Sequence, residues 1–161
     1  MNSPVPSLWS RWLVILCVVG VLFGVMLVLA PQALHGTLAP LYYDGAVGEG
    51  GFETLTRAEL RFQNWFYGLA GAVMIGWMLT LAWVVAVPFR RGEGWSWTGI
   101  AVSLVVWFVL DSYTSMVNGV AINVLFNLGF LIGFGIPLLA TYRHFHPAEA
   151  IRPSNTIRSR S

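Results

Sequence analysis

The chain contains very little charge, a single cysteine and no lysine. Only 10% of its 161 residues are charged, and all nine basic residues are arginine. Because Cys17 is the sole cysteine, no disulfide and no dithiol redox pair can form within the chain. The exclusive use of arginine is typical of a GC-rich genome, so we expect a bacterial protein. A chain with so few charges is too apolar for a soluble domain of this size.

Apolar residues dominate what remains. The sequence is 57% hydrophobic, with eight Trp and ten Phe, which is typical of an integral membrane protein. Residues 12–30, 62–88, 96–113 and 118–142 are each long enough to cross a hydrocarbon core of roughly 30 Å. The first run could also be a signal peptide, but Pro31 directly after it would hinder cleavage. We therefore predict an all-α, four-helix membrane bundle forming one domain over residues 1–142.

The segments outside these spans are predicted from local signals. Residues 31–61 should be an extracytoplasmic loop followed by an extension of the second helix, which begins with a capping box of Thr56 and Glu59. Pro137 removes the helical hydrogen bond to the carbonyl of Gly133 and should kink the last helix. Residues 143–161 should form a flexible, basic cytoplasmic tail.

The arginines predict the orientation in the membrane. With four spans both termini lie on one side, together with seven arginines, and only Arg57 and Arg61 lie on the other. Short loops rich in arginine stay in the cytoplasm. We therefore expect a multi-pass protein of the bacterial inner membrane with both termini cytoplasmic. The seven arginines are Arg11, Arg90, Arg91, Arg143, Arg152, Arg158 and Arg160.

Residues 107–127 combine apolar character with several polar side chains. Polar groups in hydrocarbon are costly, so they normally face a protein interior or a cavity. We expect a polar intramembrane cluster, for a ligand or for packing. Its candidate members are Arg61, Asn64, Asp111, Ser115, Asn118, Asn123 and Asn127.

Asp111 admits three interpretations from the sequence. It could cap the turn that follows through Ser112 or Asn118, pair with Arg61 at similar depth, or accept a proton or contact a ligand. Asn123 and Asn127 lie one turn apart on one helix face, where amides either hydrogen-bond between helices or line a polar cavity that opens outward.

Small residues at a spacing of four predict where helices approach closely. They form two GxxxG pairs and one longer strip on the second helix. The positions are Gly20, Gly24, Gly68, Ala72, Gly76, Gly129 and Gly133.

Two segments together resemble small, uncharacterised bacterial four-helix membrane proteins of the DoxX-like kind. The first is Ala58-Glu59-Leu60-Arg61 followed by Tyr67-Gly68-Leu69-Ala70-Gly71. The second is Trp107-Phe108, Asp111-Ser112, Ser115, Gly119, Asn123 and Asn127, ending in Ile136-Pro137-Leu138. The resemblance spans roughly residues 56–140. It implies the four-helix fold and no particular reaction.

The motifs of common chemistries are missing from the sequence. It carries no nucleophile elbow, no phosphate-binding loop and no metal-ligand spacing, so we predict no catalytic residue, metal, cofactor or nucleic-acid partner. The favoured function is a non-catalytic accessory or structural subunit that packs against other membrane proteins through Gly-lined and aromatic faces. The alternative is a small membrane protein that binds, transports or modifies a lipid, sterol or quinone near Asp111.

Overall fold

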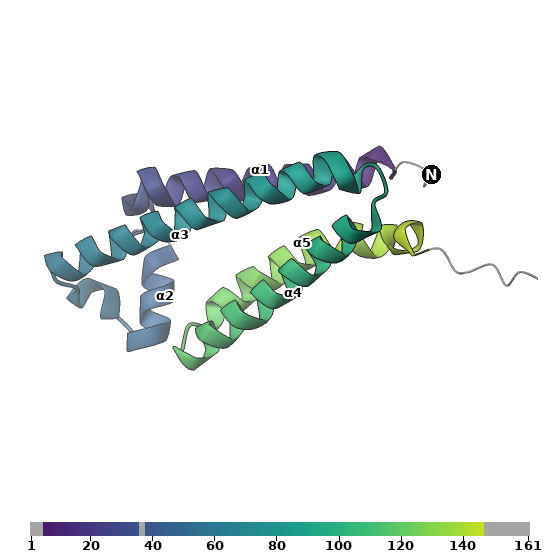
Figure 1. Ribbon diagram of the computed structural model, residues 1–161. Helices are drawn as coiled ribbons and strands as arrows, with labels where there is room; N and C mark the ends of the chain where they lie inside the picture. The colour runs from purple at the N-terminus through teal and green to yellow at the C-terminus, as the bar shows by residue number, and fades with distance from the viewer. Residues whose placement is uncertain (1–4, 36–37, 147–161) are drawn as a thin grey trace, which may run out of the picture.

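A computed structural model describes residues 5–35 and 38–146 of the chain, and over these ranges the fold is all-helical, as predicted (Figure 1). No strand occurs in either range. The elements in chain order are α1 (Ser7–Leu29), η1 (Pro31–Leu34), α2 (Leu38–Val47), η2 (Gly51–Thr54), α3 (Arg57–Val84), η3 (Val85–Phe89), α4 (Gly94–Val117) and α5 (Ala121–Phe145).

Four helices are long and apolar enough to cross a membrane, which confirms the predicted number of spans. They are α1, α3 together with η3, α4 and α5. The helix α1 begins at Ser7, before the predicted residue 12, and α4 and α5 end a few residues later than predicted. The helix α4 continues to Val117, and the turn comes at Gly119, whose φ of 77° suits glycine. The helix α5 continues to Phe145, and residues 147–161 of the predicted tail lie outside the described part.

The four long helices form two antiparallel pairs. The helix α1 packs along α3, and α4 packs along α5 (Figure 1). The start of α1, the end of α5 and the α3–α4 turn lie at one end of the molecule (Figure 1). The main apolar core is at this end, where Val5, Phe89 and Phe145 are all buried. The two pairs are therefore held together chiefly near the chain termini.

Glycines set the close contact between α1 and α3. A Cβ atom added to Gly24 would lie 2.8 Å from Ile75 Cγ1 and 3.0 Å from the carbonyl oxygen of Gly71. A Cβ on Gly71 would lie only 2.6 Å from the carbonyl oxygen of Gly24. Gly20 similarly leaves room for Met78, which is fully buried. The helix backbones approach closely because these side chains are missing.

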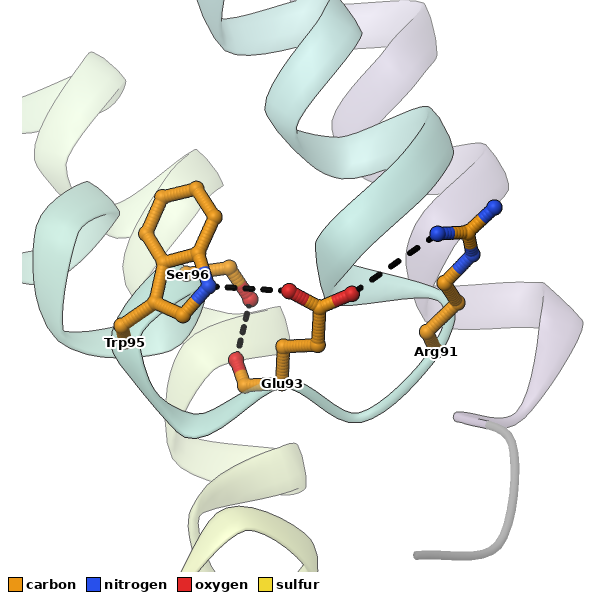
Figure 2. A network of polar contacts seen from close by, with 4 residues as sticks. All are labelled: Arg91, Glu93, Trp95 and Ser96. Atoms are coloured by element: carbon orange, nitrogen blue, oxygen red, sulfur yellow. Dashed lines mark hydrogen bonds and ion pairs between the residues drawn. The ribbon is translucent and has the colours of Figure 1, made fainter. Parts of the chain in front are cut away.

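The α3–α4 turn is organised by Glu93, as Figure 2 shows. Its carboxylate accepts a hydrogen bond of 2.9 Å from Trp95 Nε1 and lies 4.0 Å from the guanidinium of Arg91. Its carbonyl accepts a bond of 2.6 Å from Ser96 Oγ. The helical segment continues through Pro88, because a wider π-turn over Val85–Phe89 accommodates the missing N–H.

The segment between α1 and α3 differs from the predicted loop because it contains α2. Pro40 lies in the first turn of α2, where a missing N–H costs nothing. The helix α2 runs across the end of the bundle opposite the chain termini (Figure 1). The capping box before α3 is confirmed: Thr56 N donates to Glu59 Oε2 at 2.8 Å, and Glu59 N donates to Thr56 Oγ1 at 3.3 Å.

The carbonyl that Pro137 leaves free in α5 has a partner from another helix. Trp12 Nε1 of α1 donates to the carbonyl oxygen of Gly133 at 3.0 Å. The helix continues through Pro137, whose own carbonyl accepts a bond of 2.7 Å from Thr141 Oγ1. A backbone carbonyl without a partner in its own helix thus joins α1 to α5.

Candidate functional site

Asp111 on α4 is the centre of a cluster of polar side chains that joins α4 to α5. Its Oδ1 atom accepts hydrogen bonds from Asn123 Nδ2 at 2.6 Å and Asn127 Nδ2 at 2.7 Å. Ser115 Oγ lies 3.3 Å from the same oxygen, and Ser112 Oγ accepts from Asn127 at 3.4 Å. One carboxylate oxygen thus holds two amides of α5 in place.

The geometry follows from the local sequence. Asp111 precedes the end of α4 by six residues, about 9 Å at 1.5 Å per residue. The short turn at Gly119 brings α5 back beside α4, so Asn123 and Asn127, one turn apart, both face Asp111. Asn127 is only 5% exposed. The cluster is therefore inside the apolar span and is shielded by protein.

Tyr42 of α2 completes the cluster from outside the spans. Its hydroxyl donates to Asn123 Oδ1 at 2.8 Å, and its ring stacks on Phe126 at 6.2 Å between centroids. Burial raises the pKa of Tyr42 to about 12, and the charge of Asp111 acts in the same direction. The phenol therefore remains a hydrogen-bond donor at any physiological pH.

A cavity of about 340 Å³ lies beside this cluster and takes residues from all five α-helices. Its polar wall consists of Tyr42, Asp111, Asn123 and Asn127. The rest of its lining is apolar or aromatic: Val19, Gly20, Phe23, Leu38, Met74, Trp77, Met78, Trp107, Phe126 and Phe130. A largely apolar cavity with a few convergent polar groups is the usual form of a small-molecule site. The cavity is less polar than the sequence suggested, and α2 contributes to its wall.

Aromatic side chains form the wall of the cavity away from the polar cluster. The rings of Trp77 and Trp107 lie 5.6 Å apart between centroids, and Trp107 lies 5.8 Å from Phe130. Trp77 Nε1 donates to Ser103 Oγ at 3.1 Å, which satisfies its polar atom inside the span. Trp107 and Ser103 lie four and eight residues before Asp111, so one face of α4 carries all three.

The structure does not bring every predicted polar residue to the cluster. Arg61 is exposed on α3 and does not pair with Asp111; in residues 5–35 and 38–146 the one ion pair within 4.0 Å is Arg91–Glu93. Asn64 Oδ1 instead accepts a hydrogen bond of 3.1 Å from His35 Nε2. Asn118 is exposed and donates to the carbonyl of Thr114 at 2.8 Å. Of the predicted members, Asp111, Ser115, Asn123 and Asn127 come together.

The predicted small residues divide into two groups. Gly20 and Gly24 contact α3, and a Cβ atom added to Gly133 would lie 3.4 Å from Leu16 Cδ1 of α1. Cβ atoms on Gly68, Gly76 and Gly129 would meet nothing within 4 Å, and Ala72 is exposed. The second group therefore faces outward from this chain.

Sequence reasoning missed Tyr42 and the aromatic wall. Tyr42 lies in a Gly- and Pro-rich segment that was predicted to be a loop, and it is 81 residues from its partner Asn123. A signal was nonetheless present in the position of Trp107, one turn before Asp111. Trp77 lies on another helix, 30 residues before Trp107 in the sequence, so no local pattern indicated its contact with Trp107.

No protein-family model, curated protein or solved structure matches the chain. The resemblance to DoxX-like proteins therefore stays a prediction.

Proposed function

We propose that the chain is a multi-pass membrane protein that binds one small amphiphilic molecule in the cavity beside Asp111. The observation that supports this function is the form of the cavity, which has a carboxylate and two amides on one side and aromatic or aliphatic side chains elsewhere. Such a site suits a molecule with a polar head and an apolar body. This is the class that the sequence suggested as lipid, sterol or quinone.

The placement of the cluster also favours binding over packing alone. Amides that only join two helices need no empty space beside them. Asn123 and Asn127 both donate to Asp111, and all three residues also line a cavity of about 340 Å³. This volume is within the usual size range for small-molecule sites. Buried polar groups beside an apolar cavity are costly unless a partner or water uses them.

Native mass spectrometry of the purified protein tests this proposal. We expect the wild-type protein, released gently from the membrane, to retain an amphiphile. Val19→Phe adds a ring at a cavity-lining position and should lower the retained fraction at least about fivefold, a loss near 1 kcal/mol. Val18→Phe is the matched control, since Val18 and Val19 are 50% and 52% exposed and only Val19 lines the cavity. Equal retention by both variants would contradict the proposal.

A role as an accessory subunit of a larger membrane complex is the second candidate. It is favoured by the outward strip of Gly68, Ala72 and Gly76, against which no helix of the described chain packs. Gly76→Leu should then release a partner protein from the complex without unfolding the chain. Gly99→Leu, at an equally open helical position on α4, should leave the partner bound.

We also propose that the protein resides in the bacterial inner membrane with both termini in the cytoplasm. The arginines at the chain-termini end of the bundle, Arg11, Arg90, Arg91 and Arg143, support this orientation through the positive-inside rule. Cys17 is buried, so cysteines introduced at Arg91 and Glu49 can be labelled selectively. An impermeant thiol reagent should label the cysteine at position 49 in intact cells and the one at position 91 only after lysis.

A further inference from the structure

We propose, as a refinement that rests on the proposed function, that the cavity selects a primary ammonium head on an apolar body. The polar wall of the cavity offers hydrogen-bond acceptors and negative charge, while its own donors are already used. The aromatic part of the wall suits a cation as well. A lipophilic amine therefore fits the cavity better than a fatty acid, a phosphate ester or an oxidised quinone.

The first observation is that two acceptor oxygens remain open. Within the described residues, Asp111 Oδ1 accepts every side-chain hydrogen bond to that carboxylate, and Oδ2 accepts none. Asn127 donates through Nδ2, while its Oδ1 has no partner in the same part of the chain. Neither oxygen is closed off by surrounding protein. Because Asp111 and Asn127 both line the cavity, a ligand meets acceptors there.

The second observation is that the hydrogen-bond donors of the cluster already donate to acceptors within the cluster. Asn123 Nδ2 donates to Asp111 at 2.6 Å and to Ser115 at 2.8 Å. Asn127 Nδ2 donates to Asp111, and the Tyr42 hydroxyl donates to Asn123. A carboxylate oxygen only accepts, which fixes the amide nitrogens toward it. A ligand whose head only accepts hydrogen bonds, such as a quinone, gains nothing from this wall.

The third observation is electrostatic. Every group that contacts the Asp111 carboxylate is neutral, and no arginine or histidine of the described chain lies within 4.0 Å of it. The rings of Trp107 and Phe126 line the same cavity, and aromatic faces attract ammonium groups. An uncompensated carboxylate in an apolar span repels anionic heads and attracts a cation.

A series of matched ten-carbon probes tests the head-group preference. Each carries bromine at the chain end, which quenches tryptophans such as Trp77 and Trp107, and a primary amine, trimethylammonium, alcohol or carboxylic acid at the other. Quenching is titrated at neutral pH in phosphatidylcholine nanodiscs. Val19→Phe corrects for probe that merely enters the bilayer. We expect the amine to bind at least about tenfold more tightly than the acid, with the alcohol between them and the trimethylammonium weaker than the amine because it has no N–H.

Substitution of the carboxylate gives an independent readout. Asp111→Asn keeps the shape and removes the charge, so affinity for the amine should fall about tenfold or more, while affinity for the alcohol stays within about twofold. Glu49→Gln, which removes an exposed charge away from the cavity, should change neither. If Asp111→Asn does not fold, the ranking of the four probes on the wild-type protein decides alone.

The outcomes separate this inference from the function on which it rests. Acid binding that equals or exceeds amine binding would overturn the ammonium preference and leave a binding cavity in place. Amine affinity unchanged in a folded Asp111→Asn protein would overturn it as well. Quenching that is identical in the wild-type protein and Val19→Phe for all four probes would overturn the binding function itself.

Discussion

The hydroxyl of Tyr42 donates a hydrogen bond of 2.8 Å to Oδ1 of Asn123, and this bond connects α2 to the polar cluster inside the spans. The contact joins an element outside the four long apolar helices to the residues that hold Asp111. The stacking of Tyr42 on Phe126 adds an apolar contact at the same place. These two contacts of Tyr42 therefore hold α2 beside the cavity.

Tyr42→Phe should loosen α2 without unfolding the spans. The substitution removes one hydrogen bond and keeps the ring, so we expect a loss of about 1 kcal/mol in the stability of α2. Amide hydrogen exchange across residues 38–47 should rise about fivefold, while exchange in α4 stays the same. Tyr43→Phe is the control, because the Tyr43 ring contacts Phe52 and its hydroxyl bonds to nothing in the described chain. Equal exchange in the two variants would show that the Tyr42 bond does not hold α2.

The raised pKa of Tyr42 predicts a loss of stability at high pH. An ordinary tyrosine titrates near 10, whereas burial moves the pKa of Tyr42 to about 12. Between these values the folded protein keeps a proton that the unfolded chain loses, so this contribution to stability is complete below pH 10 and falls as pH rises toward 12. The difference in unfolding midpoint between wild-type protein and Tyr42→Phe should accordingly shrink as pH rises from about 9 to about 11. A constant difference would contradict the burial of this phenol.

Two glycines of α3 should respond to alanine in opposite directions. At Gly71 a Cβ atom would lie 2.6 Å from the backbone of Gly24 and 2.9 Å from Leu27 Cβ, so α1 must move away, at a cost of about 1–3 kcal/mol. At Gly76 a Cβ atom meets nothing, so alanine should stabilise the helix by about 0.5–1 kcal/mol. Unfolding in mixed detergent micelles measures both variants. A Gly71→Ala variant with the same free energy of unfolding as the wild-type protein would show that α1 and α3 do not pack as described.

The bond from Trp12 to the carbonyl of Gly133 should depend on Pro137. Trp12→Phe leaves that carbonyl without its partner and should cost about 1 kcal/mol. In Pro137→Ala the helix can supply its own N–H to the same carbonyl, so Trp12→Phe should then cost less than half as much. A double-mutant cycle of unfolding free energies checks this coupling. Additive effects would mean that the carbonyl does not need the tryptophan.

The sequence predicted the spans and part of the cluster well. Apolar runs of span length and the capping box of Thr56 and Glu59 are local signals, and each depends on a few neighbouring residues. The meeting of Asp111 with Asn123 and Asn127 is also nearly local, because a short turn and a spacing of four residues bring them together. These features need no knowledge of how the two helix pairs are arranged.

The remaining features depend on tertiary arrangement. Arg61 was matched with Asp111 by depth in the membrane, but depth does not determine the direction in which a side chain leaves its helix, and Arg61 faces outward. The sequence did not indicate the helix α2, because its segment contains Pro40 and Gly45, and proline and glycine have the lowest helix propensities. The contact of Tyr42 with Asn123 spans 81 residues of sequence, so no local pattern could indicate it.

The uneven distribution of the apolar core has a consequence for how the cavity can change in size. Val5, Phe89 and Phe145 belong to the core that joins the two helix pairs at the chain-termini end, whereas at the other end α2 packs against α5 and lines the cavity. Leu38 and Tyr42 of α2 line the cavity and are not part of that core, so a shift of α2 alters the cavity while the buried apolar residues stay in place. If the cavity binds a molecule as proposed, the size of that molecule therefore depends on the position of α2.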